Sequence, residues 1–542
     1  MLYRLLLCLL IWLPVLTQAQ KNKFTHADSL KGTYGPFRAW WDLQYYDLQV
    51  KFNIRDSSIA GKNKISYSVL TNGKIMQLDL MQPMQIDSVF HDSQPCTFRR
   101  DGNAWFIDLP VEQLKGARKE VLVYFHGRPH VAKMPPWDGG IIWSKDNQQK
   151  DWISIACQGM AAQVWFPNKD HMADEVEGCT VAYTVPGDLV AVGNGRLIKQ
   201  FLRKDSTATY VWQVKNPINN YCIIPYIGKY SNFKDTLSGK AGVLDLDYWV
   251  LDQDLSKAKQ QFKQVKSMLR CFEWWFGPYP FYEDGYKLVQ APFLGMEHQS
   301  AIAYGNNFAN GYKGRDLSQT GWGLKWDFII IHESGHEWFG NSISAKDVAD
   351  NWIHESFTAY SENLYTEFLF GKKAGAEYVI GTRKSVMNDK PLITAYNVNA
   401  GGSIDIYYKG ANMLHTLRQL VNSDSLWHAM FLSMNKTFFH KTVNTDEIEG
   451  FMSSFLKMDL RPFFEQYLRS IKLPILEYKV VKDGFAYRYV NTVQGFQMPL
   501  PVQLGQEQQR IYPDTTWQTI KTGASDLVVD KNYYVLTRFT AP

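Results

Sequence analysis

The period of the hydrophobic pattern changes near residue 250, and this change constrains the fold more than any other feature. Before about Gly228, apolar and polar residues alternate, as over residues 48–54. A period of two indicates half-buried β-strands, and Asn72-Gly73 and Asn194-Gly195 supply turn signals between such runs. Residues 20–230 are therefore predicted to form an antiparallel β domain.

After Tyr248 the apolar residues fall three and four positions apart, which predicts an amphipathic helix over residues 255–272 that ends before Gly277-Pro278. Helical patterns continue to about Ser470, and short β-like runs return after Pro474. A chain of 542 residues is too long for one hydrophobic core. We expect a multidomain α+β protein with a mainly helical domain over residues 231–470 and a small β module over residues 471–542. Further helices are expected over residues 326–339, 354–370 and 410–421.

The first nineteen residues have the layout of a secretory signal peptide. Arg4 precedes an apolar run over residues 5–16, and Thr17-Gln18-Ala19 offers a cleavage site after Ala19. The alternative is a membrane anchor, but a spanning helix needs about 20 apolar residues. We therefore expect export to the periplasm or the cell exterior, with no stable membrane insertion after cleavage.

Charge and cysteine content exclude several classes of function. The formal net charge of +5 is small for 542 residues, and no long run of Lys and Arg indicates binding to nucleic acid or lipid. Beyond the signal segment, Cys96, Cys157, Cys179, Cys222 and Cys271 show no Cys-x-x-Cys spacing. The sequence therefore predicts neither a disulfide framework nor a cysteine metal site, although one or two bridges are compatible with export.

The segment that carries the chemistry is His332-Glu333-Ser334-Gly335-His336. Positions i and i+4 of a helix lie on one face, so both imidazoles can reach one metal ion, while Glu333 is offset toward a water molecule. A hydrolytic zinc site needs a third protein ligand and one open position. Eighteen residues separate His336 from Glu355, which is by spacing alone either that ligand or an ordinary helix carboxylate. Its neighbour His354 points elsewhere and is expected not to bind metal.

With these residues the sequence resembles the gluzincin metallo-aminopeptidases, the family that includes aminopeptidase N and leukotriene hydrolase. The two histidines, the eighteen-residue spacing to Glu355 and Trp338-Phe339-Gly340-Asn341 after the second histidine are typical of it. The resemblance implies one zinc ion per chain, held by His332, His336 and Glu355. It also implies an N-terminal β saddle, a thermolysin-like catalytic domain and a C-terminal β sandwich.

Three further segments extend the resemblance. Leu294-Gly295-Met296-Glu297-His298 is similar to the family's exopeptidase motif, which implies that Gly295, Met296 and Glu297 bind substrate. Gln158, nine residues before Pro167, is similar to the residue that enters the family's substrate-amine site. The segment from Ile406 to Ala411 implies that the Tyr407 hydroxyl stabilises the oxyanion; a packed core tyrosine is the alternative.

The motifs also depart from the family pattern. His298 stands where Asn is usual, Leu294 where Gly is usual, and Ser356 follows Glu355 where Gly is usual. Pocket shape and specificity therefore cannot be carried over. Glu362, seven residues after Glu355 on the same helix face, is expected to orient a ligand.

The predicted function is that of a zinc aminopeptidase acting on peptides with a free N-terminus. Glu333 acts as the general base toward the attacking water and returns the proton to the leaving amine. Glu297 and Gln158 offer acceptors to the substrate ammonium group. The alternatives are a secreted zinc endopeptidase, an epoxide hydrolase like the family's leukotriene enzyme, and a non-catalytic peptide-binding protein.

Overall fold

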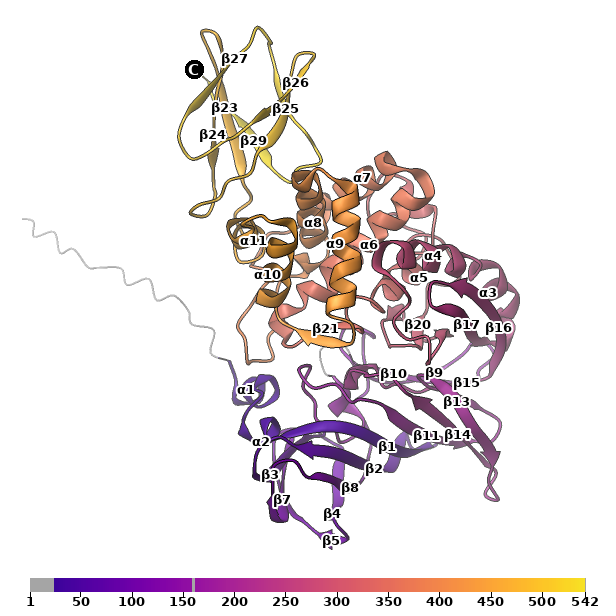
Figure 1. Cartoon of the computed structure of the whole chain (residues 1–542). Coiled ribbons are helices and arrows are strands. Elements are labelled where there is room, and N and C mark those ends of the chain that lie inside the picture. Colours follow the sequence, from indigo (N-terminus) through magenta and orange to yellow (C-terminus); the bar gives the residue numbers. More distant parts are fainter. Residues whose placement is uncertain (1–23, 158–160, 542) are drawn as a thin grey trace, which may run out of the picture.

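The computed structural model describes residues 24–157 and 161–541, and Figure 1 shows three parts stacked along the molecule. The N-terminal strands form one end, the helices the middle and the last strands the other end. The predicted signal peptide and Gln158 lie outside the described residues. Within those residues, no helix is long and apolar enough to cross a membrane.

The N-terminal part is built on an eight-stranded sheet with the order β13-β14-β11-β1-β2-β8-β4-β5. Its two longest strands, β1 and β2, are also the first two strands of the described chain. Short helices α1 (His26–Gly32) and α2 (Pro36–Ala39) precede it. The strands are β1 (Trp41–Asn53), β2 (Ser58–Val69), β4 (Gln85–His91), β5 (Gln94–Pro95), β8 (Arg118–Gly127), β11 (Cys179–Pro186), β13 (Arg196–Leu202) and β14 (Thr207–Val214).

Two smaller sheets complete this part. They are β3 (Gly73–Asp79), β7 (Ala104–Gln113) and β6 (Thr97–Asp101), and β12 (Val190–Val192), β15 (Tyr226–Gly228), β10 (Asp151–Ala156) and β9 (Gly140–Lys145). The inward faces of the sheets share one hydrophobic cluster that includes Trp41, Ile65, Ile153 and Trp165.

One strand pair departs from the antiparallel prediction. β1 and β11 run parallel, with Tyr46 opposite Cys179. A tight turn imposes an antiparallel arrangement only on strands that it joins, and more than 120 residues separate this pair. The sequence pattern of each strand is the same in either direction, so it could not reveal the parallel pairing.

A five-stranded mixed sheet lies between the N-terminal sheets and the helices, and it carries part of the predicted substrate site. Its order is β16-β17-β18-β20-β19. The short strand β19 (Gly295–Met296) pairs with β20 (Ile302–Tyr304) and ends immediately before Glu297. The other strands are β16 (Tyr230–Gly239), β17 (Gly242–Leu251) and β18 (Tyr286–Gln290).

The middle part of the described chain contains nine α-helices, α3 to α11. The single helix expected over residues 255–272 is divided in two, because the chain turns at Phe262, whose carbonyl accepts the Val265 N–H at 3.1 Å. The helices are α3 (Leu255–Gln261), α4 (Gln264–Phe276), α5 (Phe328–Gly335), α6 (Trp352–Phe370), α7 (Lys372–Gly381), α8 (Tyr408–Val421), α9 (Asp424–Thr437), α10 (Thr445–Leu456) and α11 (Arg461–Tyr467).

Helix α5 is shorter than the expected 326–339. It begins after Asp327, whose carboxylate accepts the N–H groups of Ile329 and Ile330 as an N-cap. It ends at Gly335, where an added Cβ would lie 2.6 Å from the Ser361 hydroxyl of α6. The glycine therefore allows α5 and α6 to approach closely, and His336 caps the helix.

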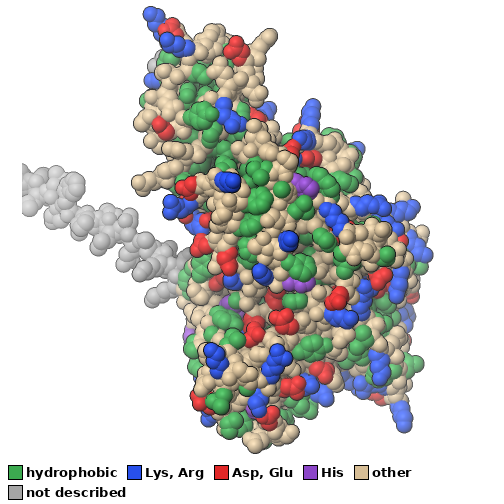
Figure 2. Space-filling view, viewed as in Figure 1, with side chains coloured by type: hydrophobic (Ala, Val, Ile, Leu, Met, Phe, Trp, Pro, Cys, Tyr) green, Lys and Arg blue, Asp and Glu red, His purple; other side chains and the backbone are tan. Residues whose placement is uncertain are grey.

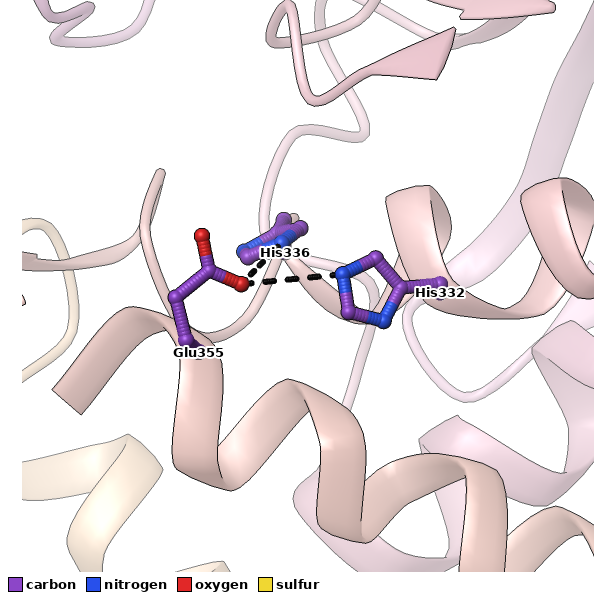
Figure 3. Close-up of side chains that lie close together, drawn as sticks. All are labelled: His332, His336 and Glu355. Carbon is purple, nitrogen blue, oxygen red and sulfur yellow. Dashed lines mark ion pairs between the residues drawn. The ribbon is translucent and has the colours of Figure 1, made fainter. Parts of the chain in front are cut away.

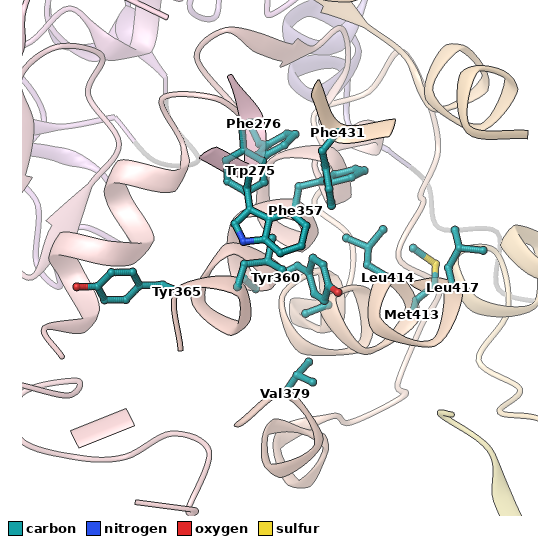
Figure 4. Close-up of a cluster of buried hydrophobic side chains, with 14 of the residues drawn as sticks. Trp275, Phe276, Phe357, Tyr360, Tyr365, Val379, Met413, Leu414, Leu417 and Phe431 are labelled. Atoms are coloured by element: carbon teal, nitrogen blue, oxygen red, sulfur yellow. The ribbon is translucent and has the colours of Figure 1, made fainter. Parts of the chain in front are cut away.

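Helix α6 is the central helix of the middle part, buried without interruption from Trp352 to Thr366. Figure 4 shows its aromatic side chains among hydrophobic side chains of α4, α8 and α9. Phe357 lies 6.1 Å from Phe431 between ring centroids, and Tyr360 lies 6.3 Å from the same ring. This packing fixes the helix that presents Glu355.

The C-terminal strands form two small sheets that rest on the helices. The Tyr534 N–H donates to the Thr416 hydroxyl at 2.9 Å, and Arg383 donates to the Lys531 carbonyl at 2.7 Å. Tyr533 and Tyr534 contact the helices, and the last strand begins after them, at Leu536. The strands are β23 (Ile475–Val481), β24 (Gly484–Val490), β27 (Gln518–Lys521) and β29 (Leu536–Phe539), and β25 (Leu500–Leu504), β26 (Glu507–Ile511) and β28 (Leu527–Val529).

The surface and the cysteines agree with the composition. Figure 2 shows basic and acidic side chains interspersed over the visible face, without a patch of one sign. Cys96, Cys157, Cys179, Cys222 and Cys271 are all buried and free. The domain boundaries at residues 230 and 470 stay predictions.

Candidate active site

The structure brings together the three side chains predicted to bind metal. His332 lies in α5, His336 caps that helix, and Glu355 lies in the first turn of α6. One carboxylate oxygen, Glu355 Oε2, lies 3.6 Å from His332 Nε2 and 3.4 Å from His336 Nε2. In Figure 3, dashed lines join this oxygen to both rings.

The other nitrogen of each imidazole has its own partner. His332 Nδ1 lies 2.7 Å from Glu362 Oε1, and His336 Nδ1 lies 3.0 Å from the Phe339 carbonyl oxygen. Acceptors at Nδ1 favour the tautomer whose Nε2 carries a lone pair. The lone pairs of both Nε2 atoms are thereby directed toward one point. Glu362 lies where the sequence predicted a carboxylate that orients a ligand.

The donor set fits Zn²⁺. Tetrahedral ligands at about 2.0–2.1 Å from zinc lie about 3.3 Å apart, close to the separations seen between Glu355 and the two histidines. Glu355 Oε2 is buried and has no hydrogen-bond donor among the described residues. Burial acts to lower the pKa of His332, but the carboxylates of Glu355 and Glu362 raise its pKa well above the ordinary value. The site is therefore electrostatically complementary to a cation.

A second cluster shares one of these histidines. Ligand atoms of Glu297, Glu333 and His336 also lie within 4.8 Å of one another. It offers one imidazole and two carboxylates, and neither carboxylate has an arrangement like the shared oxygen of Glu355. His332, His336 and Glu355 are therefore the stronger candidate metal site, and Glu297 and Glu333 line the same cavity.

Glu333 is held against a glycine. A Cβ at Gly295 would lie 2.6 Å from Glu333 Oε1, so a larger residue there would displace the carboxylate. Burial raises the pKa of Glu333, which suits a group that must accept and return a proton. The place of Gly295 in the motif therefore has a steric reason.

Glu297 is half-buried at the end of β19. The Tyr221 hydroxyl donates to Glu297 Oε1 at 3.1 Å, and the Asn341 side-chain amide donates to the Glu297 carbonyl at 2.9 Å. These contacts fix both the carboxylate and its backbone. Met296 is buried beside it and lines the cleft.

Tyr407 reaches the ligands from another part of the chain. It lies between the 3-10 turn Ile404–Ile406 and α8, and its hydroxyl donates to Glu355 Oε1 at 3.0 Å. Its ring stacks on His332 with centroids 5.8 Å apart. The hydroxyl therefore borders the space in front of the metal ligands. His354 faces elsewhere, accepting the Ala345 N–H at 2.7 Å.

The three departures from the motif lie in different surroundings. His298 is fully buried behind the site, where its Nδ1 lies 2.6 Å from the Tyr226 hydroxyl, and burial lowers its pKa to about 3. Leu294 lines the cleft. Ser356 donates to the Ile406 carbonyl at 2.6 Å and therefore joins α6 to the residue before Tyr407.

Two cavities meet at the metal ligands. The smaller, of about 330 Å³, extends from Glu297 and Glu355 toward the N-terminal part of the chain, where Asp170 and His171 line it. The larger, of about 480 Å³, contains Glu333 and Tyr407. Met296, Glu297 and Glu355 line both, so a bound molecule can occupy the two at once.

Two residues of this region carried no signal in the sequence. Tyr221, which supports Glu297, lies in the short 3-10 helix Asn220–Cys222, which matches no motif. Trp137 lines the larger cavity from the loop between β8 and β9. Each contact joins residues far apart in the chain, so no local pattern could have revealed them.

Residues 261–467 match the peptidase family M1 domain. This region includes α5, α6 and the segment with Tyr407, but not the N-terminal sheets.

Curated relatives share low identity over much of the chain. Leukotriene A-4 hydrolase of Xenopus laevis is 23% identical over 291 residues, 51% of this chain and 45% of the relative. Human aminopeptidase B is 22% identical over 417 residues, 73% of this chain and 57% of the relative. The chain thus spans about half the length of these relatives.

A solved structure extends the similarity to the fold. The M1 zinc metallopeptidase of Deinococcus radiodurans, in a variant with a bound Tyr-Ser-Ala substrate, superposes with a TM-score of 0.68 at 19% identity. The alignment covers 81% of this chain and 96% of that one. The shared fold includes β-rich and helical parts, as the sequence predicted.

Proposed function

We propose, from the premise that residues 261–467 form a peptidase family M1 domain, that this protein is a single-zinc aminopeptidase that releases the N-terminal residue of peptides. Its relatives include proteins named aminopeptidases, which supports this proposal. The chain's own contribution to the argument is the position of Glu297.

The observation that carries the proposal is a carboxylate next to the hydrolytic group. Glu297, Glu333 and His336 have ligand atoms within 4.8 Å of one another, and Tyr221 holds the Glu297 carboxylate in place. A half-buried carboxylate attracts an ammonium group through charge-assisted hydrogen bonds. A peptide whose free amine binds Glu297 has only its first peptide bond within reach of Glu333.

In the proposed reaction each residue has a separate task. His332, His336 and Glu355 hold the zinc ion, which supplies Lewis-acid polarisation when bound. Glu333 accepts the proton of the attacking water and passes it to the leaving amine. The Tyr407 hydroxyl donates to the oxygen that becomes negative as the carbonyl is attacked. In the absence of substrate that hydroxyl is held by Glu355.

The alternatives use fewer of these contacts. An endopeptidase has no need for a carboxylate at the end of its cleft, since its substrates continue past the scissile bond on both sides. A non-catalytic relative has no need for Glu333 in close contact with Gly295. No contact in the described residues favours epoxide hydrolysis over peptide hydrolysis.

The test compares free and blocked substrates. Aminoacyl fluorogenic amides and their N-acetylated counterparts should differ strongly in kcat/KM, because acetylation removes the charge that Glu297 binds. Glu297→Ala should lower kcat/KM for free amines by about tenfold to hundredfold, the effect of one charge-assisted hydrogen bond. Glu297→Gln, which keeps an acceptor without the charge, should fall between.

Equal cleavage of acetylated and free substrates by the wild-type protein would refute the assignment of Glu297 as the amine site. Gln158, the second predicted acceptor, belongs to the same proposal, and Gln158→Ala should add to the effect of Glu297→Ala.

We also propose that the protein is exported. The support is the layout of residues 1–19, which lie outside the described part of the structure. Fractionation of cells that express the full chain, compared with a chain lacking residues 2–19, tests this: retention of both forms in the cytoplasm would refute it.

A further inference from the structure

A loop of the N-terminal part forms one side of the larger cavity. Trp137, between β8 and β9, lines the same cavity as His332 and Tyr407, although about 195 residues separate it from His332. Its side chain is 58% exposed, and among the described residues it pairs with no other aromatic ring. An exposed tryptophan at the entrance of a cleft is a surface on which an apolar group can be buried.

The loop is ordered by its own hydrogen bonds. The Trp137 N–H donates to the Met134 carbonyl at 3.0 Å, and Asp138 Oδ2 accepts the Met134 N–H at 2.9 Å. Gly139 in turn donates to the Pro136 carbonyl at 3.1 Å. Trp137 is therefore presented by a compact turn, which lowers the entropy lost when a ligand binds it.

The wall that bounds the cavity with Trp137 is mostly apolar. It includes Tyr312, Leu317, Phe328, Ile406 and Tyr408. The Tyr312 and Phe328 rings pack edge to face with centroids 5.4 Å apart.

Charge is scarce along this side of the cleft. Of the described residues that line the larger cavity, none is Lys or Arg. Away from the metal cluster the remaining charged residue is Asp405, and its two carboxylate oxygens accept the N–H groups of Met387 and Asn388. Nothing on this wall is available to pair with a charged side chain of a ligand.

The two cavities differ in which half of a peptide they can hold. The smaller one adjoins Glu297, and the described side chains that line it are buried or half-buried. The larger one contains Glu333 and Tyr407 and opens to solvent at Trp137 and at Ile404, which is 62% exposed. The part of a peptide beyond the scissile bond can be of any length, so it must leave through the larger cavity.

We infer that Trp137 and the apolar wall opposite it form a binding site for a large apolar side chain of the substrate. This side chain belongs to the second residue of the substrate, immediately after the scissile bond. The wall consists of Tyr312, Leu317, Phe328, Ile406 and Tyr408. This inference rests on the proposed aminopeptidase function and adds the substrate class. The preferred substrates are peptides with an aromatic or bulky aliphatic second residue, and the selectivity depends on a residue outside the M1 domain.

The experiment uses two tetrapeptides that share their N-terminal residue and differ only in Phe or Gly at the second position. Burial of one aromatic side chain should make kcat/KM for the Phe peptide about tenfold to hundredfold higher in the wild-type enzyme. Trp137→Ala should lower this Phe-to-Gly ratio about tenfold, and Trp137→Phe should restore most of it. Met134→Ala is the matched control: Met134 lies in the same loop, is 67% exposed and does not line the cavity, so the ratio should not change.

The outcomes separate this inference from the proposed function. Equal kcat/KM for the two peptides, or a ratio that Trp137→Ala leaves unchanged, would overturn the inference while N-terminal cleavage stands. Absence of N-terminal cleavage of both peptides would overturn the proposed function and the inference with it. Circular dichroism of Trp137→Ala checks that the loop change has not altered the fold.

Discussion

The proposed metal ligands and the residues proposed to face the substrate are held in different ways. His332, His336 and Glu355 come from two helices packed through Gly335, and the chain between them is short. Glu297 directly follows the short strand β19, Tyr221 lies in a 3-10 helix, and Tyr407 lies in a turn before α8. The first group depends on the packing of two helices, whereas the second depends on the assembly of several parts of the molecule.

Because of this difference, we expect metal binding and substrate handling to change independently of each other. Substitutions among the helical ligands should alter metal content, and with it all activity. Substitutions among the substrate-facing groups should alter rate or selectivity while the metal remains bound.

Removal of one metal ligand should have the largest effect. His336→Ala should lose stoichiometric zinc and all measurable turnover, because the two remaining ligands do not make a stable tetrahedral site. Metal analysis after dialysis and assays on aminoacyl amides check this. His354→Ala is the control for a nearby buried histidine, and it should keep its zinc; retention of zinc by His336→Ala would contradict the ligand set.

Removal of the Tyr407 hydroxyl should act on rate alone. Tyr407→Phe should keep zinc and lower kcat by about 10²- to 10³-fold, as expected for an oxyanion donor. Metal analysis and steady-state kinetics on the same sample separate the two effects. An unchanged kcat would show that the tyrosine is a packing residue, and zinc loss would show that its bond to Glu355 supports the metal instead.

Glu362 should affect zinc affinity more weakly than a ligand does. Glu362→Gln keeps the shape but weakens the acceptor at His332 Nδ1, so zinc affinity should fall by about tenfold to hundredfold. Competition with a chelator measures it. Tyr378→Phe, which removes the 2.6 Å hydrogen bond to the other Glu362 oxygen, should have a smaller effect in the same direction. A zinc affinity equal to that of the wild type in Glu362→Gln would show that this carboxylate does not support metal binding.

Ser356 tests the junction between the two groups. Ser356→Ala removes the hydrogen bond to the carbonyl before Tyr407 and should lower kcat by about threefold to tenfold, the effect of one neutral hydrogen bond. Zinc content should not change. The control is Ser361→Ala on the same helix, whose hydroxyl bonds to the Thr358 carbonyl and not to the Tyr407 segment. Equal kcat in Ser356→Ala and wild type would show that this contact does not position Tyr407.

The sequence revealed the helical ligands because their geometry is local. The spacing of His332 and His336 follows from one turn of helix, and Glu355 needed only one further helix and the family resemblance. Local patterns also located α3 to α6 and α8 and the alternation within β1. They predicted the ends of helices less accurately. Helix α5 ends at Gly335, which lies against Ser361 of another helix, and this contact leaves no local pattern.

The remaining features depend on contacts between distant segments. The parallel pairing of β1 with β11, the support of Glu297 by Tyr221 and the position of Trp137 over the cleft join parts of the chain separated by tens to hundreds of residues. No periodicity records such contacts. The resemblance indicated which residues bind substrate, but the reason that Gly295 is needed, its contact with Glu333, came from the structure.

Glu297 is proposed to confine hydrolysis to the first peptide bond. The most direct test follows by mass spectrometry the products of a ten-residue peptide incubated with the zinc-loaded protein, with Glu333→Gln as the inactive control. We expect a ladder of peptides that shorten one residue at a time from the N-terminus, and no ladder from the same peptide after N-acetylation. Internal fragments from both peptides, produced at equal rates and absent with Glu333→Gln, would contradict the account.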